Sequence, residues 1–243
     1  MTVIDKEFSR LIVISLVILG ILNLFMAETI GKLVHPRMYP FTVFTLIFIS
    51  IMFIYQALSM GKGKEISRFN PKIIIFFIPL ILAAFFGVTS LGSGIASNRG
   101  MASGFFGGAG KGNRQLIERC KINGTLVFNE SDYFNLSEEL LDNIKSYDGE
   151  KIEIKGFVFK MNDFSENQIG LGRIGIWCCL ADSIMFSFIC ETHEARSFSV
   201  NDWIIVEGVL KAGTYKNSAV PFVKVTSIKK ITRPENPYVY LKL

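Results

Sequence analysis

The stretch KIEIKGFVFK, residues 151–160, alternates apolar with polar side chains and is rich in β-branched and aromatic residues. This period of two predicts a β-strand that buries one face. Four later segments are similar, and clusters of Gly, Asn and Asp separate them: GRIGIWCCLA (172–181), IMFSFIC (184–190), DWIIVEGVLK (202–211) and VPFVKVTSIKKI (220–231). Glycines inside the first and fourth segments, Gly156 and Gly208, suit the sharp bends of a closed barrel. We therefore expect an OB-like barrel of five short strands.

A helical segment comes before these strands. Residues 132–146, DYFNLSEELLDNIKS, have apolar side chains at helical spacing, and four of them share one side: Phe134, Leu140, Leu141 and Ile144. This pattern predicts a short amphipathic helix in front of the barrel.

Three uncharged apolar runs lie in the first ninety residues, at 11–27, 41–58 and 73–88. Crossing the hydrocarbon core of a bilayer takes about 20 residues, and each run reaches this length with its flanks. The first run is longer than the apolar part of a usual signal peptide, and no A-x-A-like cleavage site follows it, which favours a retained helix. The fold class that we expect is three transmembrane helices followed by an all-β (OB-like small barrel) soluble domain with a short preceding helix.

The charged residues are unevenly spread. Residues 1–114 carry 11 Lys and Arg against 4 Asp and Glu, whereas residues 115–243 carry 15 against 17. The sequence pI of about 9.0 therefore comes from cations that flank the apolar runs. It does not predict a nucleic-acid partner, which would need a basic face on the folded domain. Six loop cations on the side of the amino terminus, against three on the other side, favour an extracytoplasmic carboxyl domain.

Nine glycines lie between residues 87 and 112. The run GFFGGAGKGN (104–113) is similar to a phosphate-binding loop, but Phe105 stands where that motif needs its first glycine, and Gly112 stands where it needs Ser or Thr. A flexible tether fits this composition. We therefore expect a membrane domain with three helices (1–91), a Gly-rich linker (92–114) and an extracytoplasmic OB-like β domain (115–243).

Two neighbouring predicted strands carry thiols. Cys178 and Cys179 are adjacent, and because neighbours in a strand point to opposite faces, we expect one inside the barrel and one outside. Asp182 follows them, and Cys190 with His193 has a Cys-x-x-His spacing. Thiolate and imidazole together suit Zn²⁺ or another borderline-soft ion. The candidate metal ligands are therefore Cys178, Cys179, Asp182, Cys190 and His193.

Other interpretations of these cysteines stay open. Cys190 can form a structural disulfide with one of the pair if the domain is exported, or the cysteines are small core residues. The lack of two complete chelating pairs weighs against a metal site, and the lack of a Cys-x-x-Cys motif weighs against redox catalysis. The chain has only two histidines, His35 and His193, and neither lies in a nucleophile motif. We expect no enzyme activity, and Zn²⁺ is the one cofactor that the residues suggest.

Several short motifs occur together in this chain. They are GFV (156–158), RIGIWCCLAD (173–182), DWIIVEG (202–208) and PENPYVY (234–240), with HPRM (35–38) and NRG (98–100) in the membrane part. This set resembles the YcgQ-like family of bacterial proteins, which are described as subunits of predicted permeases with a domain of unknown function. The resemblance covers nearly the whole chain, and its Cys-Cys-x-Ala-Asp core is fairly specific. Cys190 and His193 are not part of the family pattern, so a metal site that used them would be particular to this chain.

The resemblance implies a bacterial cell-membrane protein that acts with a polytopic permease. The apolar runs carry no ionisable residue to line a polar pathway, which also favours a partner. We therefore expect a multi-pass accessory subunit of a membrane permease, whose outer β domain binds solute, metal or the permease, with the lipid bilayer and not nucleic acid as its other partner. The alternative is a membrane-tethered extracytoplasmic protein that binds a metal or an envelope component and has no transport role.

Overall fold

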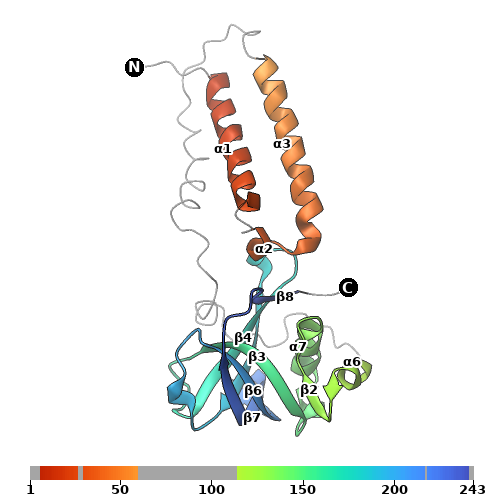
Figure 1. Cartoon of the computed structure of the whole chain (residues 1–243), viewed down its shortest axis with the longest axis vertical. Helices are drawn as coiled ribbons and strands as arrows, with labels where there is room; N and C mark the ends of the chain where they lie inside the picture. The colour runs from red at the N-terminus through yellow and green to blue at the C-terminus, as the bar shows by residue number, and fades with distance from the viewer. Residues whose placement is uncertain (1–5, 27–29, 60–113, 217, 241–243) are drawn as a thin grey trace. The chain divides into compact units, whose positions relative to one another are not determined.

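The computed structural model describes residues 6–26, 30–59, 114–216 and 218–240 (Figure 1). The chain divides into two compact units, Met1–Ser90 and Leu91–Leu243, and each unit is described by itself. The third expected membrane run, 73–88, lies outside the described residues, as does nearly all of the expected linker.

The described part of the first unit contains two long helices, with two short helices between them in the sequence. Its elements are α1 (Lys6–Met26), α2 (Ile30–Leu33), the 3₁₀ helix η1 (Pro36–Met38) and α3 (Tyr39–Ser59). Figure 1 shows α1 and α3 side by side, and the two helices pack on each other. The turn before α3 is set by a proline and a cap: Pro36 begins η1, and Nδ1 of His35 accepts a hydrogen bond from the Arg37 amide at 3.0 Å.

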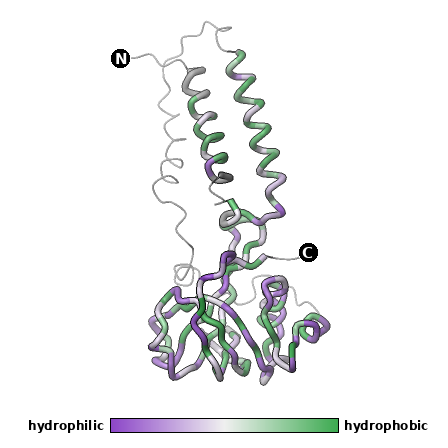
Figure 2. Tube along the Cα trace, viewed as in Figure 1, coloured by the Kyte–Doolittle hydropathy of each residue, from purple (hydrophilic) through white to green (hydrophobic). Residues whose placement is uncertain are grey.

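One helix among the described residues is long and apolar enough to cross a membrane. It is Pro36–Leu58, which has a mean hydropathy of 2.1 and no buried residues in its most apolar part. Figure 2 shows that its residues are largely hydrophobic. The first expected span, 11–27, falls on α1 (Lys6–Met26), and within the part of α1 whose side chains the structure describes the apolar helix is the shorter stretch Ile14–Asn23. The prediction of three transmembrane helices is therefore wrong for the part of the chain that the structure describes.

One mixed sheet of eight strands forms the second unit, in the order β1-β2-β3-β6-β7-β5-β4-β8. The strands are β1 (Lys121–Ile122), β2 (Thr125–Val127), β3 (Lys151–Phe159), β4 (Gln168–Ile176), β5 (Ile184–Glu191), β6 (Trp203–Tyr215), β7 (Ser218–Ile231) and β8 (Tyr238–Tyr240). The helices are α6 (Arg114–Arg119), α7 (Tyr133–Asp142), and the 3₁₀ helices η3 (Ile144–Tyr147), η4 (Leu180–Asp182) and η5 (Ala195–Ser197). The β2–β3, β4–β8 and β5–β7 pairs are parallel, and the other pairs are antiparallel.

The expected all-β OB-like small barrel is a wrong description of this unit. The strands β3 to β7 close into a ring because β3 pairs with β4 as well as with β6, but three more strands extend the sheet. These strands, β1, β2 and β8, have only two or three residues, too few to show the alternation that predicts a strand. Helices α6 and α7 also contribute buried side chains to the core, so the unit is not all-β.

Two glycines of the ring permit close approaches between backbones. A Cβ atom on Gly156 would lie 2.5 Å from the carbonyl oxygen of Gly172 on β4, and a Cβ atom on Gly208 would meet the carbonyl oxygen of Lys224 on β7. The pairing of β6 with β7 is irregular between Glu207 and Gly208. A larger residue at either glycine would therefore push two strands apart.

Helix α7 closes the apolar core of this unit. Tyr133, Phe134, Leu136 and Leu140 are buried, and the ring of Phe134 makes an edge contact with Phe186 of β5, with 4.9 Å between centroids. Burying one large apolar side chain stabilises a fold by about 1.5–3 kcal/mol, so this face anchors α7 to the sheet. The predicted helix over 132–146 is interrupted, because α7 ends at Asp142 and η3 follows.

Candidate metal centre

A cluster of two thiols and one carboxylate lies just beyond the end of β4. It consists of Cys178, Cys179 and Asp182, and one ligand atom from each lies within 4.8 Å of the other two. All three residues are half-buried. Among the described residues, no fourth His, Cys, Asp or Glu joins the group. The structure therefore brings together three of the five predicted ligands.

Asp182 fixes the bend that holds this cluster. It ends η4, and its carboxylate accepts hydrogen bonds from the amides of Cys178, at 2.8 Å, and Cys179, at 3.2 Å. A charged acceptor makes such bonds shorter and stronger than neutral ones. These two hydrogen bonds therefore hold the backbone of both cysteines in a bend around the carboxylate.

The expectation that the two cysteines face opposite sides of a strand is wrong. The predicted strand ran over 172–181, whereas β4 ends at Ile176 and Cys179 caps η4. The strand alternation therefore does not reach the thiols. Both sulfur atoms point to the same cluster instead.

The carboxylate also perturbs the thiol beside it. The hydrogen bond with Asp182, followed by burial and a hydrogen bond with Cys179, raises the pKa of Cys178 to about 12. Burial raises the pKa of Asp182, but hydrogen bonds from the Cys178 thiol and from nearby amides outweigh it, so the net pKa of Asp182 is lowered. At neutral pH the cluster therefore holds a carboxylate next to a protonated Cys178 thiol.

Cys190 lies in the core, apart from the cluster. Its exposed fraction is 0%, and it packs among apolar side chains inside the ring of strands. Burial raises the pKa of its thiol to about 12. All four cysteines of the chain are free thiols in this structure. The structure shows no disulfide between Cys190 and the adjacent pair, and Cys190 occupies the position of a small core residue.

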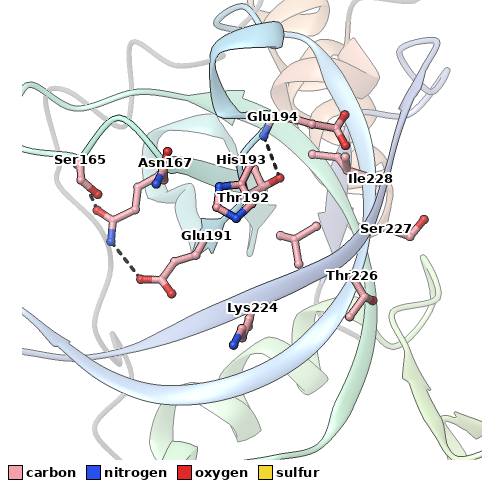
Figure 3. A pocket seen from close by; sticks show the side chains of 12 residues that line it. Ser165, Asn167, Glu191, Thr192, His193, Glu194, Lys224, Thr226, Ser227 and Ile228 are labelled. Atoms are coloured by element: carbon pink, nitrogen blue, oxygen red, sulfur yellow. Dashed lines mark hydrogen bonds between the residues drawn. The ribbon is translucent and has the colours of Figure 1, made fainter.

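His193 follows the end of β5 and faces a pocket. The pocket has a volume of about 500 Å³, and Figure 3 shows His193 among its polar walls. No cysteine lines it; the lining residues are Ser165, Asn167, Gln168, Glu191, Thr192, His193, Glu194, Lys224, Val225, Thr226, Ser227 and Ile228. Gln168 braces the wall by donating a hydrogen bond to the Glu191 carboxylate at 3.2 Å. The structure therefore separates His193 both from Cys190 and from the thiol cluster.

A buried arginine on β4 was missed by the sequence reasoning. The guanidinium of Arg173 donates hydrogen bonds to the Glu130 carboxylate and to the backbone carbonyl of Asn236, the latter at 3.2 Å. It also lies over the rings of Tyr133 and Trp203, at 5.4 and 5.0 Å from their centroids. The signal was present, because Arg173 is the one charged residue within β4.

Comparisons with known proteins match both units of the chain. Residues 8–102 match the DUF1980 N-terminal domain, and residues 108–241 match the DUF1980 C-terminal domain. The UPF0703 protein YcgQ of Bacillus subtilis is 26% identical over 191 residues, which cover 69% of this chain and 67% of that protein.

Solved structures are similar only over part of the chain. Asparaginyl-tRNA synthetase from Pyrococcus horikoshii has a TM-score of 0.25 at 21% identity, over 38% of this chain and 23% of that one. A small single-stranded DNA-binding protein from Streptomyces coelicolor has a TM-score of 0.24 at 14% identity, over 34% of this chain and 93% of that one. Likenesses this distant carry no argument about function.

Proposed function

The chain belongs to the DUF1980 family and is similar to YcgQ, and from this premise we propose that it is a membrane-attached accessory subunit that binds a thiophilic metal or metalloid ion. Cys178 and Cys179 are the proposed ligands, and Asp182 completes the site. The proposal assigns no chemical reaction to the domain.

The observation that carries this proposal is the convergence of three ligand atoms within 4.8 Å on a half-buried bend. Thiolates select soft and borderline ions over hard ones. Cys178 and Cys179 are half-buried and so partly exposed to solvent, whereas Cys120 and Cys190 are buried. The cluster is therefore the part of the described domain best suited to capture such an ion from solution.

The membrane part supports an accessory role. The helix Pro36–Leu58 is apolar and exposed, as expected of a lipid-facing segment. Apart from Arg37 near its first turn, it carries no Asp, Glu, Lys, Arg or His, whereas pathways for polar solutes are lined by such groups. We therefore assign the pathway to a polytopic permease that binds this chain.

A titration of the full chain in lipid nanodiscs tests the metal site. Ligands that bind only the folded state raise the melting temperature with increasing free ligand, so Zn²⁺, Cd²⁺ and arsenite are titrated separately against the reduced protein. We expect at least one of them to raise the melting temperature of the wild type and not of the Cys178→Ser/Cys179→Ser double variant. The matched control is Cys120→Ala, which leaves the cluster intact. No shift with any ion would contradict the proposal.

The second half of the proposal concerns the partner. Protein gently extracted from its native membrane should migrate together with a larger polytopic permease. A chain that binds metal but always purifies alone would favour the alternative role, a tethered metal-binding protein without a transport partner.

A further inference from the structure

We infer that the ligand of this cluster is a trivalent metalloid hydroxide of the arsenite class, bonded to the sulfur atoms of Cys178 and Cys179, with Asp182 as a positioning residue. This inference rests on the proposed function and narrows its ligand from thiophilic ions in general to one chemical class.

The number of available ligand atoms favours this class. Structural Zn²⁺ sites are almost always closed by four protein ligands, but this cluster offers three, and no fourth His, Cys, Asp or Glu among the described residues joins them. Trivalent arsenic makes three bonds in a pyramid, and its lone pair takes the remaining direction. Two sulfur atoms and one retained hydroxide therefore satisfy arsenic(III), whereas the three protein atoms leave a structural Zn²⁺ site one ligand short.

The carboxylate of Asp182 is already engaged in hydrogen bonds, so the two sulfur atoms are the direct ligands. Its two oxygen atoms already accept the amide hydrogens of Cys178 and Cys179, at 2.8 and 3.2 Å. Breaking these charge-assisted bonds to ligate an ion directly would release the bend that brings the thiols together. Asp182 therefore acts through the cysteines, and the third bond of the arsenic keeps a hydroxide.

The adjacency of the thiols supplies the affinity. Once one sulfur atom is bonded, the other is already within 4.8 Å, so the second bond forms within the molecule at a high effective concentration. Cys120 and Cys190 are both buried and do not compete for the ligand. Among the cysteines of the chain, only this pair forms an accessible dithiol.

The binding step balances without any oxidant or reductant. Arsenite is an uncharged As(OH)₃ molecule at neutral pH. Two As–S bonds form, two As–O bonds and two S–H bonds break, and each released hydroxide leaves with a thiol proton as water, while arsenic stays trivalent.

The test uses the full chain in nanodiscs with arsenite and with phenylarsine oxide, whose single arsenic atom forms two bonds to sulfur. Intact mass should show one arsenic per chain, and X-ray absorption should show two As–S bonds. Cys178→Ser and Cys179→Ser should each weaken retention by about 100-fold or more, since the intramolecular second bond is lost. Cys120→Ala is the matched control and should retain the wild-type affinity. Melting curves without ligand identify any variant that has not folded, in which case the corresponding alanine variant replaces it.

Asp182→Asn separates positioning from ligation. We expect it to slow association by about tenfold, as loss of a supporting hydrogen-bond partner typically does, while the dissociation rate and the two As–S bonds stay unchanged. A faster dissociation with an unchanged association rate would make Asp182 a ligand and overturn its assigned role. Binding of Zn²⁺ or Cd²⁺ at the dithiol without any arsenic adduct would overturn the inference and leave the proposed function standing. No ligand at all would contradict both.

Discussion

Arg173 on β4 and the thiol cluster that begins five residues later use polar groups in opposite ways. The guanidinium of Arg173 is fully buried and is held by groups from distant segments, among them Glu130 and Asn236. The polar groups of Cys178, Cys179 and Asp182 are half-buried and are held by one another within a single bend.

This difference separates polar groups that hold the fold from polar groups that can bind a ligand. Removing a partner of Arg173 leaves a charge inside the core, where it cannot be hydrated. Changing a member of the cluster leaves groups that water can still reach. Substitutions at Arg173 or its partners should therefore lower the free energy of unfolding, whereas substitutions in the cluster should mainly weaken ligand binding.

The largest expected effect on stability is that of Glu130→Gln. It should lower the free energy of unfolding by about 3 kcal/mol, because it leaves a buried guanidinium without its counter-charge. Arg173→Met should cost less, since the carboxylate that remains on Glu130 is 51% exposed and can be hydrated. Urea unfolding of the full chain, followed by tryptophan fluorescence, measures both. A larger loss for Arg173→Met would show that its contacts with the two aromatic rings outweigh the charge pair.

A pair of identical substitutions at two places sharpens the comparison. Cys190→Ser buries a hydroxyl in the apolar core and should cost about 1–3 kcal/mol. Cys179→Ser, on the half-buried bend, should change stability by about 0.5 kcal/mol or less. The same unfolding experiment measures both, and equal losses would show that the bend is as tightly packed as the core.

The reactivity of Cys178 tests the electrostatic effect of Asp182. The raised pKa of this thiol, about 12, means that thiolate is scarce at pH 8, so alkylation by iodoacetamide should be slow and should speed up as the pH rises. Asp182→Asn removes the largest cause of the shift, so the pKa should fall and alkylation at pH 8 should be faster, by about tenfold for each pKa unit. Peptide mass spectrometry after timed alkylation measures the rate. Unchanged rates would show that the carboxylate does not control this thiol.

The smallest expected effect is that of His193→Ala. The side chain is exposed on the wall of a pocket without cysteines, so stability should change by about 0.5 kcal/mol or less and ion binding at the cluster should stay the same. A weaker metal-induced shift in melting temperature in this variant would show that His193 is a ligand of the ion.

The sequence predicts the segments that carry the fold better than the ends of those segments. Alternation locates the long strands within a few residues, but it predicted a strand over 172–181 that stops at Ile176. Trp177 and the two cysteines have side chains that are common in strands. The sequence pattern of a strand therefore continues past Ile176, where the strand itself ends. The chain leaves the strand because the Asp182 carboxylate captures two amides, and alternation contains no information about such a bond.

The candidate site was predicted in part for a related reason. A Cys-x-x-His spacing looks like a chelating pair, but Cys190 points into the core from β5 and His193 lies beyond the end of that strand. Cys178, Cys179 and Asp182 converge because they share one local bend, which sequence proximity does predict. The contacts of Arg173 join residues 43 and 63 positions apart, and a single sequence cannot reveal them.

The short strand β8 has a consequence for how copies of this protein behave at high concentration. It covers the open edge of β4 by pairing with residues Ile174 to Ile176, and Trp177 separates this pairing from the two cysteines. Without β8 that edge would present unpaired backbone groups, which recruit strands from other chains. A second chain paired there would extend the sheet from one copy into the next. The three residues of β8 thus block this edge against a neighbouring copy.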